Sequence, residues 1–229
     1  MPRRSPPLVP ADNRHAILGP EPLSFDAARA IRQLRGKDRS LAALIDRARP
    51  FELDLRPTQT TFHALAESIV YQQLSGRAAA TIFGRLETAC GSLSPERLLQ
   101  TPDTTLRGAG LSGAKLAALK DLAQKTLDGT VPDVADLRVL DDDAIVERLT
   151  RVRGIGRWTV EMLLIFRLGR PDVLPIDDYG VRKGFAIAYR KKELPKPKEL
   201  AAYGERWRPF RTVASWYLWR ALDKPGARE

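Results

Sequence analysis

The chain has 229 residues, 43% of them hydrophobic, which is enough to bury the core of one domain or of two closely packed lobes. It carries 38 Lys and Arg against 28 Asp and Glu, and the resulting net charge of +10 favours a polyanionic partner. Its single cysteine excludes an intramolecular disulfide framework and any metal or iron–sulfur site with four cysteine ligands.

The first sixty residues lead from a polar arm into helices. Residues 1–20 are predicted to form a flexible N-terminal arm, because closely spaced prolines oppose both helix and sheet. Apolar residues at helical spacing then predict helices over residues 25–35 and 40–49. Residues 51–56, FELDLR, show the only convincing strand-like alternation in the chain. Since the remaining periodicity is helical, the sequence predicts an all-α fold.

Residues 60–90 contain two further helices that are interrupted near Gln73-Leu74-Ser75-Gly76. A leucine in such a break usually packs in the core, and this reading of Leu74 stays open beside a functional one. A later glycine-rich turn precedes a helix over residues 114–127. Because Ala114-Lys115 follows Gly113, the pattern of a nucleotide-hydrolysing phosphate loop is absent.

A tight turn at Gly154-Ile155-Gly156 joins two predicted helices, of which the first covers residues 142–151 behind an Asp141 cap. The glycines suit a backbone with positive φ, and Ile155 suits an anchor in the core. The second helix begins near Arg157 and directs its N–H groups and the positive end of its dipole outward. An anion such as a DNA phosphate fits this arrangement.

Two carboxylates, Asp177 and Asp178, stand before a third helix, where such a pair is usually one helix cap and one dipole partner. With the hairpin, Arg157-Trp158-Thr159 and Leu174-Pro175, they resemble the helix-hairpin-helix DNA glycosylase superfamily, specifically its 3-methyladenine DNA glycosylase II branch. The resemblance covers about residues 25–222 and implies the compact form of that family.

The resemblance implies a glycosylase domain over residues 21–229, built from two helical lobes with the active site in the cleft between them. The middle lobe is expected over about residues 75–175, and the other lobe from the N- and C-terminal helices. The implied activity is hydrolysis of the N-glycosidic bond of alkylated purines such as 3-methyladenine and 7-methylguanine. Bifunctional members carry a lysine at the position of Trp158, so the tryptophan implies that this chain has no strand-cleaving lyase activity.

In the family's register, Asp178 is the catalytic carboxylate and Asp177 caps or orients the helix. The resemblance and the clustering of electron-rich rings suggest a base pocket that stacks on a cationic base. The residues expected to form this pocket are Trp158, Met162, Tyr179, Trp216 and Trp219. Trp216 fits core packing equally well, since it lies three residues from Trp219 on an apolar helix.

The run from Gln73 to Ser75 resembles the family's wedge, which fills the gap that a flipped base leaves. Leu74 is the first wedge candidate and Ser75 the second, and Gln73 is expected to probe the opposite strand. Contact with the DNA backbone is expected from Lys115 or Ser112. Phosphate binding is expected from the hairpin residues Gly154, Ile155, Gly156 and Arg157. The carbonyls expected to hold a monovalent cation, Na⁺ or K⁺, belong to Thr150, Val152 and Ile155.

The expected partner is double-stranded DNA with alkylated bases, bound by a monomer without a catalytic cofactor. No apolar run spans a membrane, and the N-terminus lacks a secretory signal, which predicts a cytoplasmic, nucleoid-associated protein. Two rival functions remain: a glycosylase for oxidised or deaminated bases, and a non-catalytic sensor of damaged DNA. A sensor would not need Asp178.

Overall fold

The computed structural model describes residues 23–56 and 60–223, and the arm predicted over residues 1–20 lies outside these ranges. Every regular element in the described ranges is a helix, so the predicted all-α class is confirmed. None of these helices combines the length and the apolar character needed to cross a bilayer.

The helices and their bounds, in chain order, are α1 Ala27–Lys37, α2 Arg39–Arg47, α3 Thr61–Tyr71, α4 Gly76–Cys90, α5 Pro95–Gln100, α6 Asp103–Gly108, α7 Gly113–Leu127, α8 Val134–Val139, α9 Asp142–Leu149, α10 Arg157–Phe166, α11 Tyr179–Ala188, α12 Pro197–Gly204, the 3-10 helix η1 Glu205–Trp207 and α13 Arg211–Arg220.

Polar side chains begin many of these helices by accepting a hydrogen bond from a backbone N–H of the first turn. Asp38 caps α2, Ser112 caps α7 and Asp141 caps α9, the last as predicted. Because each of these side chains satisfies an N–H group that has no partner within the helix, the caps fix where the helices start.

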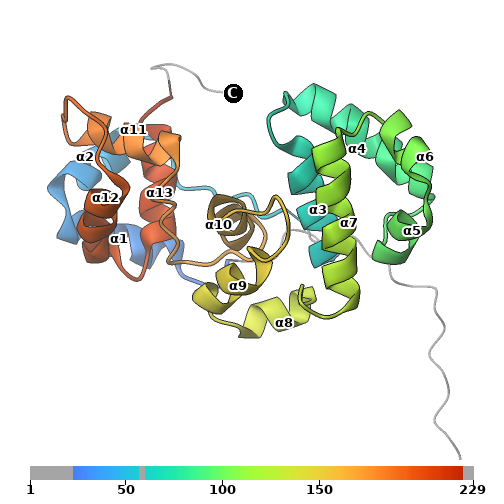
Figure 1. The fold of residues 1–229 in the computed structure, drawn as a ribbon. Coiled ribbons are helices and arrows are strands. Elements are labelled where there is room, and N and C mark those ends of the chain that lie inside the picture. Colours follow the sequence, from blue (N-terminus) through green and yellow to red (C-terminus); the bar gives the residue numbers. More distant parts are fainter. Residues whose placement is uncertain (1–22, 57–59, 224–229) are drawn as a thin grey trace, which may run out of the picture.

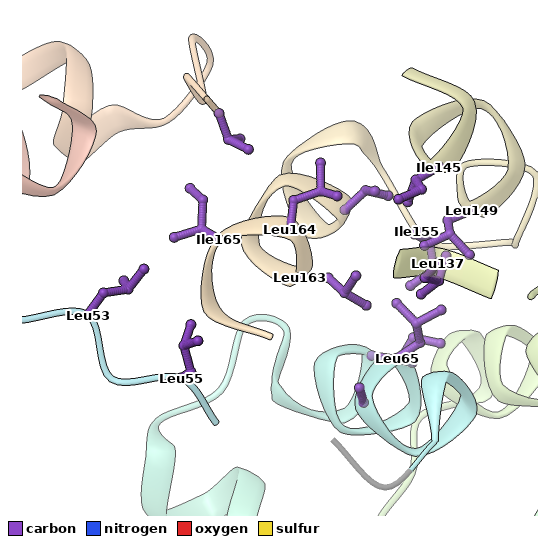
Figure 2. Close-up of a cluster of buried hydrophobic side chains, with 14 of the residues drawn as sticks. Leu53, Leu55, Leu65, Leu137, Ile145, Leu149, Ile155, Leu163, Leu164 and Ile165 are labelled. Carbon is purple, nitrogen blue, oxygen red and sulfur yellow. The ribbon is translucent and has the colours of Figure 1, made fainter. Parts of the chain in front are cut away.

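Residues 51–56, which show strand-like alternation in the sequence, form no strand in the described structure, although their backbone lies outside the helices. The alternation has another cause, because Leu53 and Leu55 are buried against α10 while the residues between and after them face out. Figure 2 shows both leucines beside Ile165. The backbone N–H of Arg56 donates to the carbonyl of Phe166 at 3.0 Å, which ties the segment to the end of α10.

The helices gather in two groups with α8, α9 and α10 between them (Figure 1). In one group α13 packs against α1, α2 and α11, so the two ends of the chain share one core. In the other group α7 packs against α3, α5 and α6, and α3 also contacts α4. Helix α3 thus packs with this group although it ends before residue 75, where the middle lobe was expected to begin. The chain crosses from the first group to the second and returns through α10.

Helix α10 is fixed by buried side chains around it (Figure 2). Leu163, Leu164 and Ile165 are at most 5% exposed. The same cluster includes Leu149 of α9 and Ile155 of the turn between α9 and α10. Closely packed protein interiors resist displacement of their side chains. The side chains that α10 presents to solvent are therefore held in defined positions.

Candidate active site

The turn between α9 and α10 is anchored in the core and shaped by one glycine. Val152 and Ile155 are 1% and 4% exposed, and Gly154 has φ +79°, a conformation that favours glycine. A positive φ was also predicted for Gly156, and that prediction is wrong: its φ is −94°, and it serves as the N-cap of α10. Glycine has no side chain to cap a helix, so no N-cap side chain accepts a hydrogen bond from the first N–H groups of α10.

Two side chains from the α3–α7 group hold this hairpin in place. The Asp121 carboxylate of α7 accepts the backbone N–H of Arg153 at 2.7 Å. The Gln72 side chain, just after α3, donates to the Gly154 carbonyl at 2.9 Å. The hairpin and the turn after α3 are therefore directly joined.

Cation binding by the hairpin carbonyls and phosphate binding by Arg157 stay predictions. The Val152 carbonyl accepts the Ile155 N–H at 3.0 Å and retains a second lone pair for a cation, and Thr150 is the C-cap of α9. The Arg157 guanidinium is half exposed and donates from Nε to Glu161 Oε1 at 3.1 Å. Its charge thus lies at the start of α10, beside the hairpin.

Asp178 accepts hydrogen bonds from three directions. Its Oδ1 accepts the backbone N–H of Val181 at 2.8 Å and the indole N–H of Trp219 at 2.8 Å. Its Oδ2 accepts the indole N–H of Trp158 at 2.8 Å. The structure therefore joins three residues that are distant in sequence, from α10, the start of α11, and α13.

The expectation that Asp177, and not Asp178, caps the helix is wrong. Asp178 is itself the N-cap of α11, whereas Asp177 is exposed and precedes the cap. Capping and the proposed chemistry can share one carboxylate, because it has two oxygens with about four acceptor sites between them. The backbone N–H holds Oδ1, and the two indoles fix the plane of the group.

A pocket of about 680 Å³ opens between α3 and α10; Asp178 does not line it, but Trp158, which donates to Asp178, does. Among the predicted site residues, it is lined by Trp158, Met162, Gln73, Gly154 and Gly156. Trp219 does not line it directly, but stacks on the pocket residue Phe166 with ring centres 5.8 Å apart. Tyr179 is 66% exposed and lies outside this lining, at the start of α11.

Trp216 is not brought to this site. It is 4% exposed and packs edge-on against Phe51 at 5.2 Å, and the cations of Arg49 and Arg220 lie 5.5 and 5.2 Å from its ring centre. The sequence had left core packing open for Trp216, and the structure places it there. Since residues three apart share a helix face, the spacing alone does not separate the two tryptophans; their different packing partners do.

The predicted wedge residues form the tight turn between α3 and α4. Gln73 has φ +58° and lines the pocket, Leu74 is 39% exposed, and Ser75 is the N-cap of α4. The exposed fraction of Leu74 contradicts its reading as a core residue. Which of the three enters DNA stays a prediction.

Lys115, expected to contact DNA, has protein partners instead. Its Nζ donates to the carbonyls of Val70 and Gln72 at 2.6 and 2.9 Å. These are carbonyls at the C-terminal end of α3, which lack partners within the helix. Ser112, the other residue expected at the DNA backbone, caps α7. Lys115 therefore supports the wedge turn from behind.

Several pocket residues were missed from the sequence, among them Tyr71, Phe166, Glu67 and Arg167. Phe166 lies four residues beyond Met162, as Met162 lies four beyond Trp158, so helical periodicity places all three on one face. Extending that series by one turn would have identified it. No comparable signal marked Glu67, because its partner Arg167 is 100 residues away in sequence.

Glu161 is a buried acid close to the same centre, with 6% of its side chain exposed. Burial raises the pKa of Glu161 to about 7, although the charge of Arg157 opposes the shift; the nearby Asp177 and Asp178 add to it.

Comparison with known proteins gives a consistent result. The family described as "HhH-GPD superfamily base excision DNA repair protein" matches residues 66–209. DNA-3-methyladenine glycosylase 1 of Schizosaccharomyces pombe is 37% identical over 162 residues, which cover 69% of this chain and 71% of that protein. A solved structure of the S. pombe 3-methyladenine DNA glycosylase in complex with abasic DNA matches with a TM-score of 0.70 at 34% identity, covering 86% of this chain and 100% of that one. DNA-3-methyladenine glycosidase from Bacillus halodurans matches with a TM-score of 0.77 at 34% identity, covering 87% and 90%.

Proposed function

The chain belongs to the HhH-GPD superfamily of base excision DNA repair proteins, and on this premise we propose that it is a monofunctional DNA glycosylase for alkylated purines. The observation that carries the proposal is the Asp178 carboxylate, fixed by two indole N–H groups, of which one belongs to Trp158 in the lining of the pocket. The named activity of the similar S. pombe and B. halodurans proteins supports the same substrate class.

The chemistry follows from the position of a fixed negative group near a flipped nucleotide. As the C1′–N bond breaks, its electron pair leaves with the base and the sugar becomes oxocarbenium-like. The Asp178 carboxylate stabilises that positive charge, orients the attacking water and accepts its proton as the water oxygen bonds to C1′. The products are a free base and an abasic site in an intact strand.

The choice of substrate follows from the rings around the carboxylate. A purine alkylated at N3 or N7 is cationic, so the departing electron pair neutralises it and no acid has to protonate it. Trp158, 47% exposed, and the stacked pair of Phe166 and Trp219 offer electron-rich faces to such a base. No lysine stands at position 158, so we propose that the enzyme forms no Schiff base and leaves the strand uncut.

DNA would be held by the elements around the pocket. We assign phosphate binding to Gly154, Ile155, Gly156 and Arg157, with the carbonyls of Thr150, Val152 and Ile155 open to Na⁺ or K⁺. The turn at Gln73-Leu74-Ser75 fills the space of the flipped base. Because one chain supplies both walls of the pocket, we propose that the enzyme acts as a monomer on duplex DNA, in the cytoplasm at the nucleoid.

The test compares wild type with Asp178→Asn and Asp177→Asn on N-methylated duplex DNA. Asparagine is as good an N-cap as aspartate, so Asp178→Asn should fold while losing the negative charge. Asp177 is the matched control, being exposed and one residue away. We expect wild type and Asp177→Asn to release methylpurines, and Asp178→Asn to be slower by at least 100-fold, about 3 kcal/mol in the barrier.

Each rival function gives a different result in the same experiment. Strands that break without alkali treatment would contradict the monofunctional assignment. Wild type that releases nothing yet binds methylated DNA tightly would be a damage sensor, with Asp178 only a helix cap. Release of oxidised or deaminated bases, but not of methylpurines, would assign the other glycosylase specificity.

A further inference from the structure

The first residue of helix α10 is an arginine held by an acid that is buried in the same helix. Arg157 Nε donates to Glu161 Oε1 at 3.1 Å. The arginine side chain is 56% exposed, whereas that of Glu161 is only 6% exposed. Residues four apart lie on one helix face, so the buried acid holds Nε while the guanidinium reaches solvent.

The stability of α10 does not explain this pair. A cation at the start of a helix lies at the positive end of the helix dipole, which disfavours Arg157 there. An arginine placed four residues before a glutamate is also the less stabilising of the two possible orders. A buried carboxylate needs compensation that an apolar side chain does not, and burial raises the pKa of Glu161 to about 7 although the charge of Arg157 opposes the shift. The pair therefore requires an explanation other than helix stability.

The place of Arg157 in the hairpin supplies one. It follows the N-cap Gly156, where no side chain accepts a hydrogen bond from the first N–H groups of the helix. Its guanidinium has five N–H donors in a planar fork, of which Glu161 accepts the one at Nε. Free donors of an arginine bind a phosphate through two parallel hydrogen bonds, which requires a defined orientation of the guanidinium.

We propose that Glu161 is a positioning residue, which fixes the guanidinium of Arg157 beside the hairpin so that its remaining N–H groups meet a DNA phosphate. A long exposed side chain loses conformational freedom when it binds, and a side chain that is already held loses less. Glu161 thus strengthens the binding of DNA without touching it. This inference rests on the DNA glycosylase function and on the phosphate binding proposed above for Arg157.

A second acid near the same arginine provides the comparison. Asp143 of α9 lies 3.9 Å from Nη2 of Arg157 and is 95% exposed, so it is a loose partner beside the buried one. Neutralising either acid makes the protein more positive by one charge, which alone strengthens the attraction of DNA. Only the loss of a positioning contact weakens binding. The direction of the change therefore separates positioning from simple charge.

The experiment measures the affinity of wild type, Glu161→Met and Asp143→Asn for a DNA duplex that contains a tetrahydrofuran analogue of an abasic site, by fluorescence anisotropy at one fixed salt concentration. Methionine fills the space of the glutamate side chain but provides no charged acceptor. We expect Glu161→Met to bind about fivefold more weakly, the scale of ordering one long side chain on binding. Asp143→Asn should bind at least as tightly as wild type.

Thermal unfolding of the same preparations tests the structural alternative. An ordinary helix-stabilising pair would lower the melting temperature of Glu161→Met and leave its affinity equal to that of Asp143→Asn. A positioning residue gives the opposite pattern: affinity falls while the melting temperature does not, because an apolar side chain has replaced a buried charge.

A double-mutant cycle shows whether Glu161 acts through Arg157. We expect Arg157→Gln to weaken binding, and the further change Glu161→Met to have no effect in that background, since the group it positions is gone. If Glu161→Met weakens binding equally with and without Arg157, the acid acts by another route and the proposal is overturned.

Two more outcomes decide the inference. Glu161→Met that binds as tightly as Asp143→Asn overturns it. If Glu161→Met loses its circular dichroism signal, Glu161→Gln replaces it, because a neutral acceptor holds the guanidinium less strongly than a carboxylate does, and an affinity equal to that of Asp143→Asn again overturns the proposal. Wild type that binds no duplex DNA overturns the proposed function as well, a result that is distinct from variants that bind alike.

Discussion

The replacement Gly180→Ala should disable the site without unfolding the protein. Gly180 is the second residue of α11 and lies against the ring of Trp219. A Cβ at this position would lie 2.8 Å from Trp219 Cδ1, and 3.1 Å from both Trp219 Nε1 and Asp178 Oδ1. All three contacts are shorter than the ordinary separation of non-bonded heavy atoms, about 3.5–4.0 Å.

The size of the effect follows from these distances. To restore normal contacts, the Trp219 ring must withdraw by about 1 Å, which lengthens its 2.8 Å hydrogen bond to Asp178 Oδ1 beyond bonding range. A misplacement of about 1 Å costs on the order of 100-fold in rate, or about 3 kcal/mol in the barrier. The alanine itself favours the helix by about 0.5–1 kcal/mol relative to glycine, which opposes any loss of stability.

The assay is single-turnover release of 3-methyladenine, paired with thermal unfolding of the same preparations. Gly84→Ala on α4 is the control, because a Cβ there meets nothing within 4 Å. We expect Gly84→Ala to retain the full rate and Gly180→Ala to lose about 100-fold at a nearly unchanged melting temperature. A Gly180→Ala rate within about threefold of wild type would refute the claim that Trp219 positions the carboxylate, because 1 Å of displacement should cost far more.

Two further predictions concern stability. Because burial raises the pKa of Glu161 from the ordinary 4.5 to about 7, its protonated form stabilises the fold below pH 4.5, and this contribution is lost as the pH rises through 7. Glu161→Gln should therefore gain up to about 3 kcal/mol relative to wild type between pH 5 and pH 8 in urea unfolding, and parallel pH profiles would contradict this. Lys115→Met should lose about 1–3 kcal/mol in the same assay, since two carbonyls at the end of α3 lose their donor. The control Lys120→Met, which breaks a more exposed pair with Asp103, should lose less than about 1 kcal/mol, and equal losses would refute the role of Lys115.

Local patterns in the sequence were sufficient for the helices and the hairpin. Apolar spacing predicted helices at residues 25–35 and 40–49, within two residues of α1 and α2 at each end. The Asp141 cap and the turn at Gly154 depend on chemistry within a few residues, so they could be predicted as well. For these elements the sequence contains the cause of the structure.

Predictions that depended on a side chain's direction in three dimensions were less reliable. The alternation at residues 51–56 indicates only that every second side chain is buried, and an extended segment lying on α10 buries Leu53 and Leu55 as a strand would. Trp216 and Trp219 occupy one helix with similar neighbours, and only the packing of α13 turns the first to the core and the second to Asp178. The pair of Glu67 and Arg167 in the pocket lining joins residues that are 100 positions apart, so no local sequence pattern predicts it.

The residues that hold Asp178 and the residues of α3 that line the pocket belong to different helices. Asp178, the proposed reactive group, is also the N-cap of α11, so its position is set by how α11 packs on α13. That contact is close at Gly184, where a Cβ would lie 1.9 Å from the Leu218 carbonyl oxygen. Glu67 lines the pocket from α3, in the other helical group, and pairs there with Arg167 at the end of α10. Since α10, α11 and α13 hold the carboxylate and α3 supplies a separate part of the pocket lining, substitutions on α3 can reshape the pocket without disturbing the hydrogen bonds that hold Asp178.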